Sequence, residues 1–262
     1  MNQGNEDTAS GVMGQMTRSH FLQERCKPNL PTKHHPIASN SLSCPAMSTD
    51  TQWIQQLRGR FIVFDGPDGS GKTTQFRRVI DLAKASDIAV CEVREPGGTF
   101  IGEQIRKILL DPENTEEVDV YCEMLLFMAS RAQLISQKIR PALAAGQLVL
   151  ADRFISSTLA YQGTAGGLPI DDIMRVGQIA LRDCWPDLTV VFDVDQKTAS
   201  TRLNPLLDRM EQKGEAYHRT VRQGYLDQVK NNPDGYALID ATASADDVFE
   251  ELGTALAEKF GS

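Results

Sequence analysis

The residues Gly66 to Thr73 read Gly-Pro-Asp-Gly-Ser-Gly-Lys-Thr and fill the G-x-x-x-x-G-K-[ST] pattern of a phosphate-binding P-loop. Glycines let the backbone approach phosphate oxygens, the amides at the start of a following helix point at the anion, and Lys72 adds a cation. The hydroxyl of Thr73 has the chemistry to ligate magnesium. The pattern therefore predicts a site for the phosphates of a nucleoside triphosphate, built from Gly66, Pro67, Asp68, Gly69, Ser70, Gly71, Lys72, Thr73 and Thr74.

The sequence on either side of the P-loop has the expected structure. Residues 61–65 form an apolar run typical of a buried strand, and in residues 74–85 the side chains of Phe76, Val79 and Ile80 recur at helical spacing. An ordinary glycine-rich turn that opens a helix is the alternative. The order of strand, glycine loop and helix favours the phosphate site.

Five short apolar segments, separated by helix-length stretches, predict an α/β fold of the P-loop NTPase-like type. This is a three-layer fold with a five-stranded parallel sheet, helices on both faces and a short lid. The longest predicted helix spans residues 117–145, with a bend near Pro141. Ligands collect at the carboxyl ends of such strands, which places the P-loop, residues 94–99 and the Asp152-Arg153 pair around one cleft. The predicted strands are residues 61–65, 88–93, 148–152, 188–193 and 236–240.

Composition and charge narrow the class of protein. The formal net charge of -8 argues against binding to nucleic acid or to an anionic membrane, so we expect neither partner. The five cysteines are scattered and never form C-x-x-C, which suits a reducing compartment. No run approaches the length of a membrane span, and no signal peptide is evident. We expect a soluble, cytoplasmic protein.

The N-terminal residues 1–57 differ from the rest and are expected to form a flexible extension, with the folded domain at 58–262. The extension is polar and shows no sustained apolar period. Cys26, His34, His35 and Cys44 suggest a metal cluster, but their spacing matches no common zinc site. Translation that begins at Met47 is another explanation for the extension.

The distribution of histidine and arginine narrows the chemistry. Of the four histidines only His218 lies outside the extension, which argues against a histidine-based catalytic triad. Phosphoryl transfer to an acceptor that is already anionic needs only alignment and neutralisation of charge. Asp152 closes an apolar strand, as a magnesium-associated carboxylate does in P-loop enzymes. The candidate cations, each of which has an alternative reading as a surface or ion-pairing residue, are Arg94, Arg106, Arg131, Arg153 and Arg209.

Several separated motifs, in order along the chain, resemble those of thymidylate kinases of the bacterial type. The resemblance covers the chain from about Arg60 to its C-terminus. The motifs that carry it are residues 64–74 (FDGPDGSGKTT), 94–99 (REPGGT), 105–106 (IR), Phe127 with 129–131 (ASR), 152–154 (DRF), 160–163 (AYQG), 186–189 (PDLT) and 207–209 (LDR).

The resemblance implies an enzyme that transfers the γ-phosphoryl group of ATP to dTMP, with Mg2+, to give dTDP and ADP in dTTP synthesis for DNA replication. It also implies a homodimer. In this reading Lys72 holds the ATP phosphates, Thr73 and Asp152 organise the metal, and Arg94 and Arg153 hold the acceptor phosphate.

The remaining implied roles concern the nucleoside of dTMP. Phe127 is expected to stack on thymine, although its helical spacing alone favours core packing. Arg131 is expected to reach the O4 edge, with Thr158 and Gln162 completing base recognition. The other implied contacts are Arg106 in the same pocket, Tyr161 where a 2'-hydroxyl would lie, and Asp68 as the acceptor from the 3'-hydroxyl.

The chain departs from the family at the lid and the P-loop. Some members carry an arginine within the P-loop, where this chain has Gly69, so the lid is expected to supply that charge. The lid candidate, residues 202–209, contains only Arg202 and Arg209. We expect Arg209 to act with Lys72 and Arg153 in catalysis, because residues 207–209 are the part that resembles the family.

Two other functions remain open at this stage. A kinase of another nucleoside monophosphate or small acceptor would use the same loop and sheet. A nucleotide-dependent switch is disfavoured, because no Asn-Lys pair for an N-K-x-D guanine signature occurs in the sequence.

Overall fold

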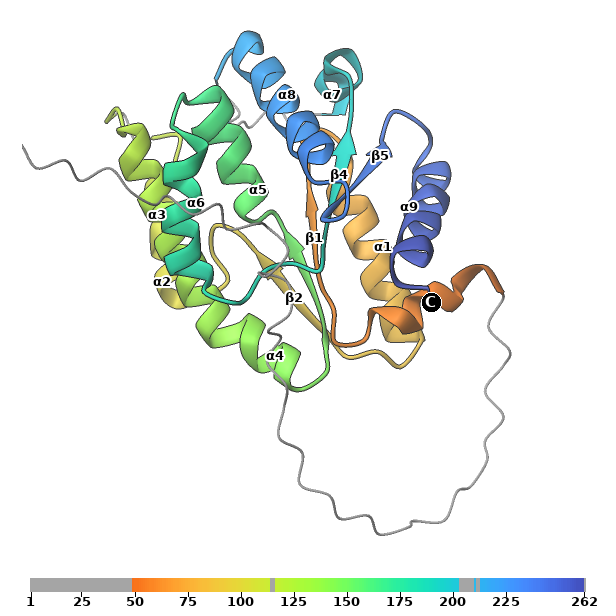
Figure 1. Cartoon of the computed structure of the whole chain (residues 1–262). Coiled ribbons are helices and arrows are strands. Elements are labelled where there is room, and N and C mark those ends of the chain that lie inside the picture. Colours follow the sequence, from red (N-terminus) through yellow and green to blue (C-terminus); the bar gives the residue numbers. More distant parts are fainter. Residues whose placement is uncertain (1–48, 114–115, 203–209, 211–212, 262) are drawn as a thin grey trace, which may run out of the picture. The chain divides into compact units, whose positions relative to one another are not determined.

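Figure 1 shows the computed structural model of the chain, which describes residues 49–113, 116–202, 210 and 213–261. Five parallel strands form one sheet in the order β2-β3-β1-β4-β5, which confirms the predicted parallel sheet. The strands are β1 (Phe61–Asp65), β2 (Val90–Arg94), β3 (Leu148–Asp152), β4 (Leu188–Asp193) and β5 (Tyr236–Asp240).

Four strands have the predicted bounds, but β2 does not. It begins at Val90 rather than Ile88. The Ile88 amide donates to the carbonyl of Ala83 at 2.9 Å and so completes the end of the preceding helix. Asp87 has a φ of 59°, which turns the chain before the strand can start.

Helices cover both faces of the sheet, as predicted. Along β1, Ile62 and Phe64 enter one apolar core, while Phe61 and Val63 enter the other, because successive side chains of a strand point to opposite faces. Helices α1 and α9 cover the first core and α3 and α6 the second (Figure 1). The helical segments that matter for the site are α1 (Lys72–Ala85), α2 (Phe100–Leu110), α3 (Val120–Leu134), α5 (Ile155–Thr158), η4 (Leu159–Ala165), α6 (Ile170–Leu181), α7 (Gln196–Arg202), α8 (Glu215–Asn231) and α9 (Ala245–Phe260).

The long helix predicted over residues 117–145 is three segments. Asp119 caps the start of α3 by accepting hydrogen bonds from the Tyr121 and Cys122 amides at 2.9 and 3.3 Å. A π-helical turn (Ile135–Ile139) then precedes α4 (Arg140–Ala144). Pro141 has no N–H to donate, so the regular ladder of hydrogen bonds cannot run through this point. The expected irregularity near Pro141 is present as this π turn.

The segment just before Arg58, which the sequence analysis assigned to the flexible extension, is helical and packs against the domain. Residues Thr49–Leu57 form the short 3-10 helix η2, and Trp53, Ile54 and Leu57 are buried against the core that α9 covers. A Cβ on Gly253 of α9 would lie 2.9 Å from the indole nitrogen of Trp53, so this glycine makes room for the ring. We therefore propose that the folded domain begins within η2.

The predicted lid lies almost entirely outside the described residues. Only Arg202, at the end of α7, is described, and residues 203–209, which include Arg209, are not.

Among the helices that the structure describes, none combines the length and apolar character needed to cross a bilayer.

Truncation at two positions tests where the domain begins. A chain that starts at Met47 keeps η2 and is expected to melt like the full-length protein. A chain that starts at Arg58 loses Ile54 and Leu57, and each such side chain contributes about 1.5–3 kcal/mol when fully buried. We expect its melting temperature in a thermal denaturation scan to be clearly lower. Equal melting temperatures for both truncations would place the start of the domain at Arg58.

Candidate active site

The P-loop joins β1 to α1 with a backbone that only glycine tolerates at two points. Gly66 and Gly69 have φ of 133° and 76°. A Cβ would lie 2.4 Å from the carbonyl oxygen of Phe192 at Gly66, and 2.6 Å from that of Ala199 at Gly69. An arginine side chain has no room at Gly69 while α7 packs against the loop. The packing of α7 against the loop therefore explains why this chain has Gly69 where some family members carry an arginine.

Lys72, the first residue of α1, is folded back onto the loop. Its ammonium group donates to the carbonyl oxygens of Gly66 and Pro67 at 3.1 and 2.9 Å. Burial, followed by repulsion from Arg153, lowers the pKa of Lys72 to about 8. An anion held by this loop would favour the charged lysine, so phosphate binding and lysine protonation reinforce each other.

A hollow of about 470 Å3 lies over the P-loop. It has the position and the donors expected for nucleotide phosphates. The residues that line it are Asp68, Gly69, Ser70, Gly71, Lys72, Thr73, Thr74, Asp152, Arg153 and Arg202.

The two predicted metal residues, Thr73 and Asp152, both face this hollow. No described side chain donates a hydrogen bond to the Asp152 carboxylate, so its oxygens can accept from other groups. In the described part of the chain, no cluster of three or more His, Cys, Asp or Glu could hold an ion by itself. The donor set fits Mg2+, which usually binds through one or two protein oxygens together with water and substrate phosphates.

A second cavity, of about 130 Å3, adjoins the hollow. Asp68, Asp152 and Arg153 line both spaces, so a ligand in one meets a ligand in the other at these residues. All of the predicted substrate-binding residues line the second cavity. Phe127 is half-buried and lines this cavity instead of packing wholly in the hydrophobic core. These residues are Asp68, Arg94, Arg106, Phe127, Arg131, Arg153, Thr158, Tyr161 and Gln162.

One end of the second cavity is built around a buried ion pair. Arg131 is 1% exposed, and its Nε donates to Glu95 at 2.7 Å. Its Nη2 donates to the Thr158 hydroxyl at 3.2 Å. Burial, only partly offset by Arg131, raises the pKa of Glu95 to about 7. The Oε1 atom of Glu95 has no hydrogen-bond partner among the described residues, so this end of the cavity retains acceptor capacity.

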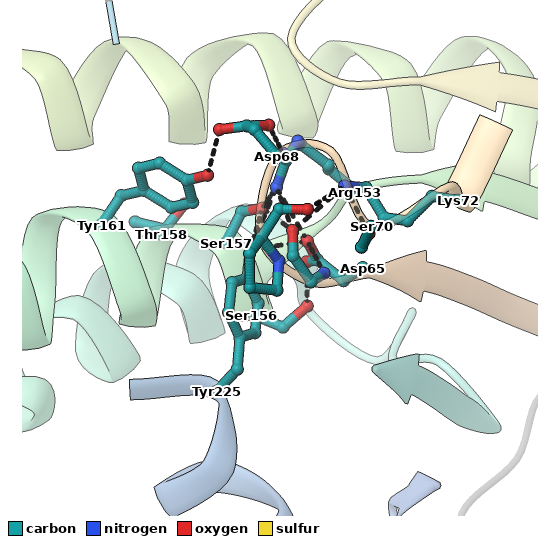
Figure 2. Close-up of polar contacts among 12 residues, drawn as sticks. Asp65, Asp68, Ser70, Lys72, Arg153, Ser156, Ser157, Thr158, Tyr161 and Tyr225 are labelled. Atoms are coloured by element: carbon teal, nitrogen blue, oxygen red, sulfur yellow. Dashed lines mark hydrogen bonds and ion pairs between the residues drawn. The ribbon is translucent and has the colours of Figure 1, made fainter. Parts of the chain in front are cut away.

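Arg153 lies at the junction of the two spaces (Figure 2). It is the first residue after β3, and its backbone has a positive φ of 66°. Its Nη2 is ion-paired with Asp68. Asp68 also accepts from the Tyr161 hydroxyl at 2.7 Å. Burial raises the pKa of Asp68, but the charges of Arg153 and Lys72 outweigh this and leave it below its ordinary value. Asp68 is thus held ionised between two cations.

The two remaining arginines of the cavity lie at its rim. Arg94 is half-exposed, and its Nη2 donates to both carboxylate oxygens of Glu103, at 3.2 and 3.3 Å. Arg106 Nη1 donates to the carbonyl of Pro96 at 3.0 Å. Both arginines thus have protein partners, and both line the cavity.

Several residues of the site were not predicted from the sequence. Glu95 and Asp65 belong to recognised motifs, but nothing local marks them as partners of Arg131 and Arg153. Tyr225 lies on α8, far along the chain, and its hydroxyl donates to Asp65 at 2.7 Å. No sequence signal identifies that contact, because it depends on how α8 packs.

The comparisons with known proteins agree with this geometry. A family model described as thymidylate kinase matches residues 64–252, which include every residue that lines the two spaces. A thymidylate kinase of Geobacillus sp. is 41% identical over 197 residues, which is 74% of this chain and 93% of the relative. One from Caldanaerobacter subterraneus is 44% identical over 185 residues, or 70% and 88% of the two chains. The crystal structure of thymidylate kinase from Ehrlichia chaffeensis has a TM-score of 0.60 and 31% identity, and it covers 75% of this chain and 98% of that chain.

The buried Glu95 predicts a pH-dependent contribution to stability. Because its pKa is raised from 4.5 to about 7 in the folded state, folding is favoured by its neutral form, and this contribution is lost as pH rises from about 5 to 8. Glu95→Gln removes the titration. We expect the unfolding free energy of the wild type, minus that of the variant, to fall across this range in urea titrations. A pH-independent difference would contradict the assignment.

Proposed function

The chain belongs to the thymidylate kinase family, and we propose how its two adjoining spaces divide the substrates of the reaction. The enzyme transfers the γ-phosphoryl group of ATP to dTMP, giving dTDP and ADP. The proposal assigns the ATP phosphates to the hollow over the P-loop and dTMP to the second cavity. The observation that carries it is the shared wall of Asp68, Asp152 and Arg153.

On the ATP side, Lys72 and the amides of residues 66–74 are proposed to bind the phosphates. Lys72 would then exchange its bonds to the backbone carbonyls for phosphate oxygens. Thr73 and Asp152 are proposed to hold Mg2+, which would neutralise part of the phosphate charge when bound.

On the acceptor side, Arg153 and Arg94 are proposed to hold the dTMP phosphate. That phosphate is largely ionised near neutral pH, since its second pKa is about 6, so it needs no general base to become a nucleophile. The protein's task is to align it with the γ-phosphoryl group and to neutralise charge. A position at the junction of both spaces supports this role for Arg153.

The base of dTMP is proposed to lie at the end of the cavity formed by Arg131, Thr158 and Gln162. Phe127 would stack on the ring face and Arg131 would donate to the O4 edge. Arg131 is buried and held by Glu95, so it can donate in a fixed direction. Arg106 is proposed to line the same pocket.

The sugar is proposed to lie against Tyr161 and Asp68. The Tyr161 ring is buried, and its hydroxyl is fixed by Asp68 at 2.7 Å, which supports a role in excluding a 2'-hydroxyl. Asp68 has acceptor capacity for the 3'-hydroxyl because its carboxylate stays ionised.

A further cation is proposed to come from the lid. Arg209 remains our candidate, because residues 207–209 carry the resemblance to the family. Arg202 lines the ATP hollow, but its Nη1 donates to the carbonyl of Ala241 at 2.7 Å. That bond supports a structural role for Arg202.

Substrate dependence and Lys72 together test the proposed function. ATP turnover in a coupled assay is expected to require dTMP, with dUMP slower by about 10- to 200-fold for the missing methyl and CMP and GMP slower still. Lys72→Ala is expected to lower kcat/KM by about 10²- to 10³-fold, as the loss of a transition-state donor does. The matched control is Lys84→Ala, at the far end of α1, whose exposed pair with Glu92 touches neither space.

Equal use of CMP and dTMP would overturn the base-pocket assignment and favour a kinase of another monophosphate. Full activity of Lys72→Ala would overturn the P-loop assignment.

A homodimer is proposed to form through α2 and α3. Ile101 and Ile108 on α2 are 51% and 49% exposed, and Leu125 on α3 is 52% exposed. The two α2 residues are spaced to lie on one stripe, and α2 packs against α3 (Figure 1). Several large apolar side chains left exposed on two packed helices favour a subunit interface at this place.

We also propose that the enzyme acts in the cytoplasm, where ATP is available.

Leu125→Glu tests the interface. Burial of a carboxylate in an apolar contact is costly, so the variant is expected to elute as a monomer in size-exclusion chromatography with light scattering. Thr254→Glu, at an exposed position on α9 in the opposite layer, is the matched control and is expected to leave the mass unchanged. A monomeric wild type, or a Leu125→Glu variant that remains dimeric, would argue against this face.

A further inference from the structure

The hydroxyl of Tyr225 lies beneath the phosphate-binding site although its helix is remote from the P-loop in sequence (Figure 2). The side chain is fully buried. Its hydroxyl donates to Asp65 at 2.7 Å, lies 2.8 Å from the Ser157 hydroxyl, and accepts from Arg153 Nη1 at 3.1 Å. Three polar groups of the site therefore meet at one phenol oxygen.

The residue before Tyr225 explains how α8 reaches this depth. A Cβ on Gly224 would lie 2.8 Å from the Thr164 hydroxyl and 3.1 Å from the Cα of Ala160. Only glycine allows α8 to approach η4 so closely. The sequence Gly224-Tyr225 thus combines the close approach with the side chain that uses it.

The two terminal nitrogens of the Arg153 guanidinium have different partners. Its Nη1 has only two hydrogens and faces four acceptors at 3.0–3.1 Å, which are Asp65, the carbonyl of Gly66, Ser157 and Tyr225. Its Nη2 points instead to Asp68, at the junction of the two spaces. The Nη1 contacts fix the plane of the guanidinium and so determine where Nη2 lies.

Tyr225 is suited to this position because a phenol both donates and accepts. Burial and the charge of Asp65 raise its pKa well above the ordinary value, so it remains a neutral hydroxyl. Its hydrogen is directed to the Asp65 carboxylate, which leaves an oxygen lone pair for Arg153. Phenylalanine would fill the same volume but would remove both interactions.

We propose that Tyr225, together with Ser157, is a positioning residue for Arg153 and holds Nη1 against Asp65 so that Nη2 faces the acceptor phosphate. This rests on the proposed role of Arg153 in binding that phosphate. Tyr225 itself touches no substrate in this account. Its effect on the reaction passes through the guanidinium.

Tyr225→Phe is the first test, and the chain offers a matched control. Tyr236→Phe also removes one phenol oxygen at the α8–β5 contact, where the hydroxyl donates to Gln228 at 2.9 Å and touches neither Asp65 nor Arg153. Hydrogen bonds to charged groups predict that Tyr225→Phe lowers kcat/KM for dTMP about 10- to 100-fold. We expect KM for ATP to change less than about twofold, and Tyr236→Phe to change neither constant by more than that. A general loss of structure would instead raise both KM values.

A double-mutant cycle then asks whether the effect passes through Arg153. Titration calorimetry measures dTMP affinity for wild type, Tyr225→Phe, Arg153→Ala and the double variant. If Tyr225 acts through Arg153, Tyr225→Phe weakens dTMP binding in the wild type but changes it less than about twofold in the Arg153→Ala background. Equal losses in both backgrounds overturn the proposal.

The outcomes separate this proposal from the function it rests on. If Arg153→Ala leaves dTMP affinity unchanged, the assignment of Arg153 to the acceptor phosphate is wrong. If Arg153→Ala weakens binding and Tyr225→Phe does not, only the positioning role of Tyr225 is wrong. Should Tyr225→Phe fail to fold, Ser157→Ala removes the neighbouring hydroxyl bonded to Arg153 at 3.0 Å and is expected to show the same loss for dTMP alone. An unaffected Ser157→Ala would then overturn the proposal.

Discussion

The arrangement of the site depends on the burial of one carboxylate, Asp65, at the end of β1. A buried carboxylate is costly unless hydrogen bonds and a counter-charge compensate for lost hydration. Asp65 is fully buried and receives the Gly66 amide at 2.9 Å, the guanidinium of Arg153, and hydroxyls from α5 and α8. Its donors come from four separate segments of the chain. Satisfying this one charge therefore fixes the P-loop, the turn after β3 and α8 relative to one another.

The parallel sheet makes this convergence possible. Its register sets both Phe64 of β1 and Arg94 of β2 beside Asp152 of β3, so three strand ends reach the same edge. The chain then turns sharply at Arg153, where the left-handed backbone directs the guanidinium under the P-loop rather than along the strand. A residue in that conformation is strained, and the bonds to Asp65 compensate for the strain. The same bonds thus determine both local geometry and the position of the cation.

The sequence was sufficient for the sheet, because apolar strands and the glycine loop are local signals, and the resemblance of its motifs to a family identified the residues that line the second cavity. It failed where the outcome depends on contacts between distant segments. The irregularity near Pro141 was expected from its missing N–H, but its form, a π-helical turn over Ile135–Ile139, has no signal in the apolar periodicity. Residues of η2 were assigned to the extension since Trp53 and Ile54 acquire meaning only when α9 provides the surface that buries them. Tyr225 was missed for the same reason, because its partner Asp65 lies on the first strand.

Two carboxylates that line the second cavity, Glu95 and Asp68, show how the site creates direction within a chain of net charge -8. The pKa of Glu95 is raised because burial outweighs a single arginine, whereas that of Asp68 is lowered because Arg153 and Lys72 together outweigh burial. Net charge therefore does not distinguish the two ends of the cavity, because Glu95 offsets only part of the Arg131 charge, and at the junction Arg153 and Lys72 face Asp65, Asp68 and Asp152. The ends differ instead in the direction of their hydrogen-bond donors, since Glu95 fixes Arg131 at one end and Asp65 fixes the plane of Arg153 at the other. The orientation of a ligand is therefore set by where individual donors point inside the cavity, in a chain whose net charge is negative.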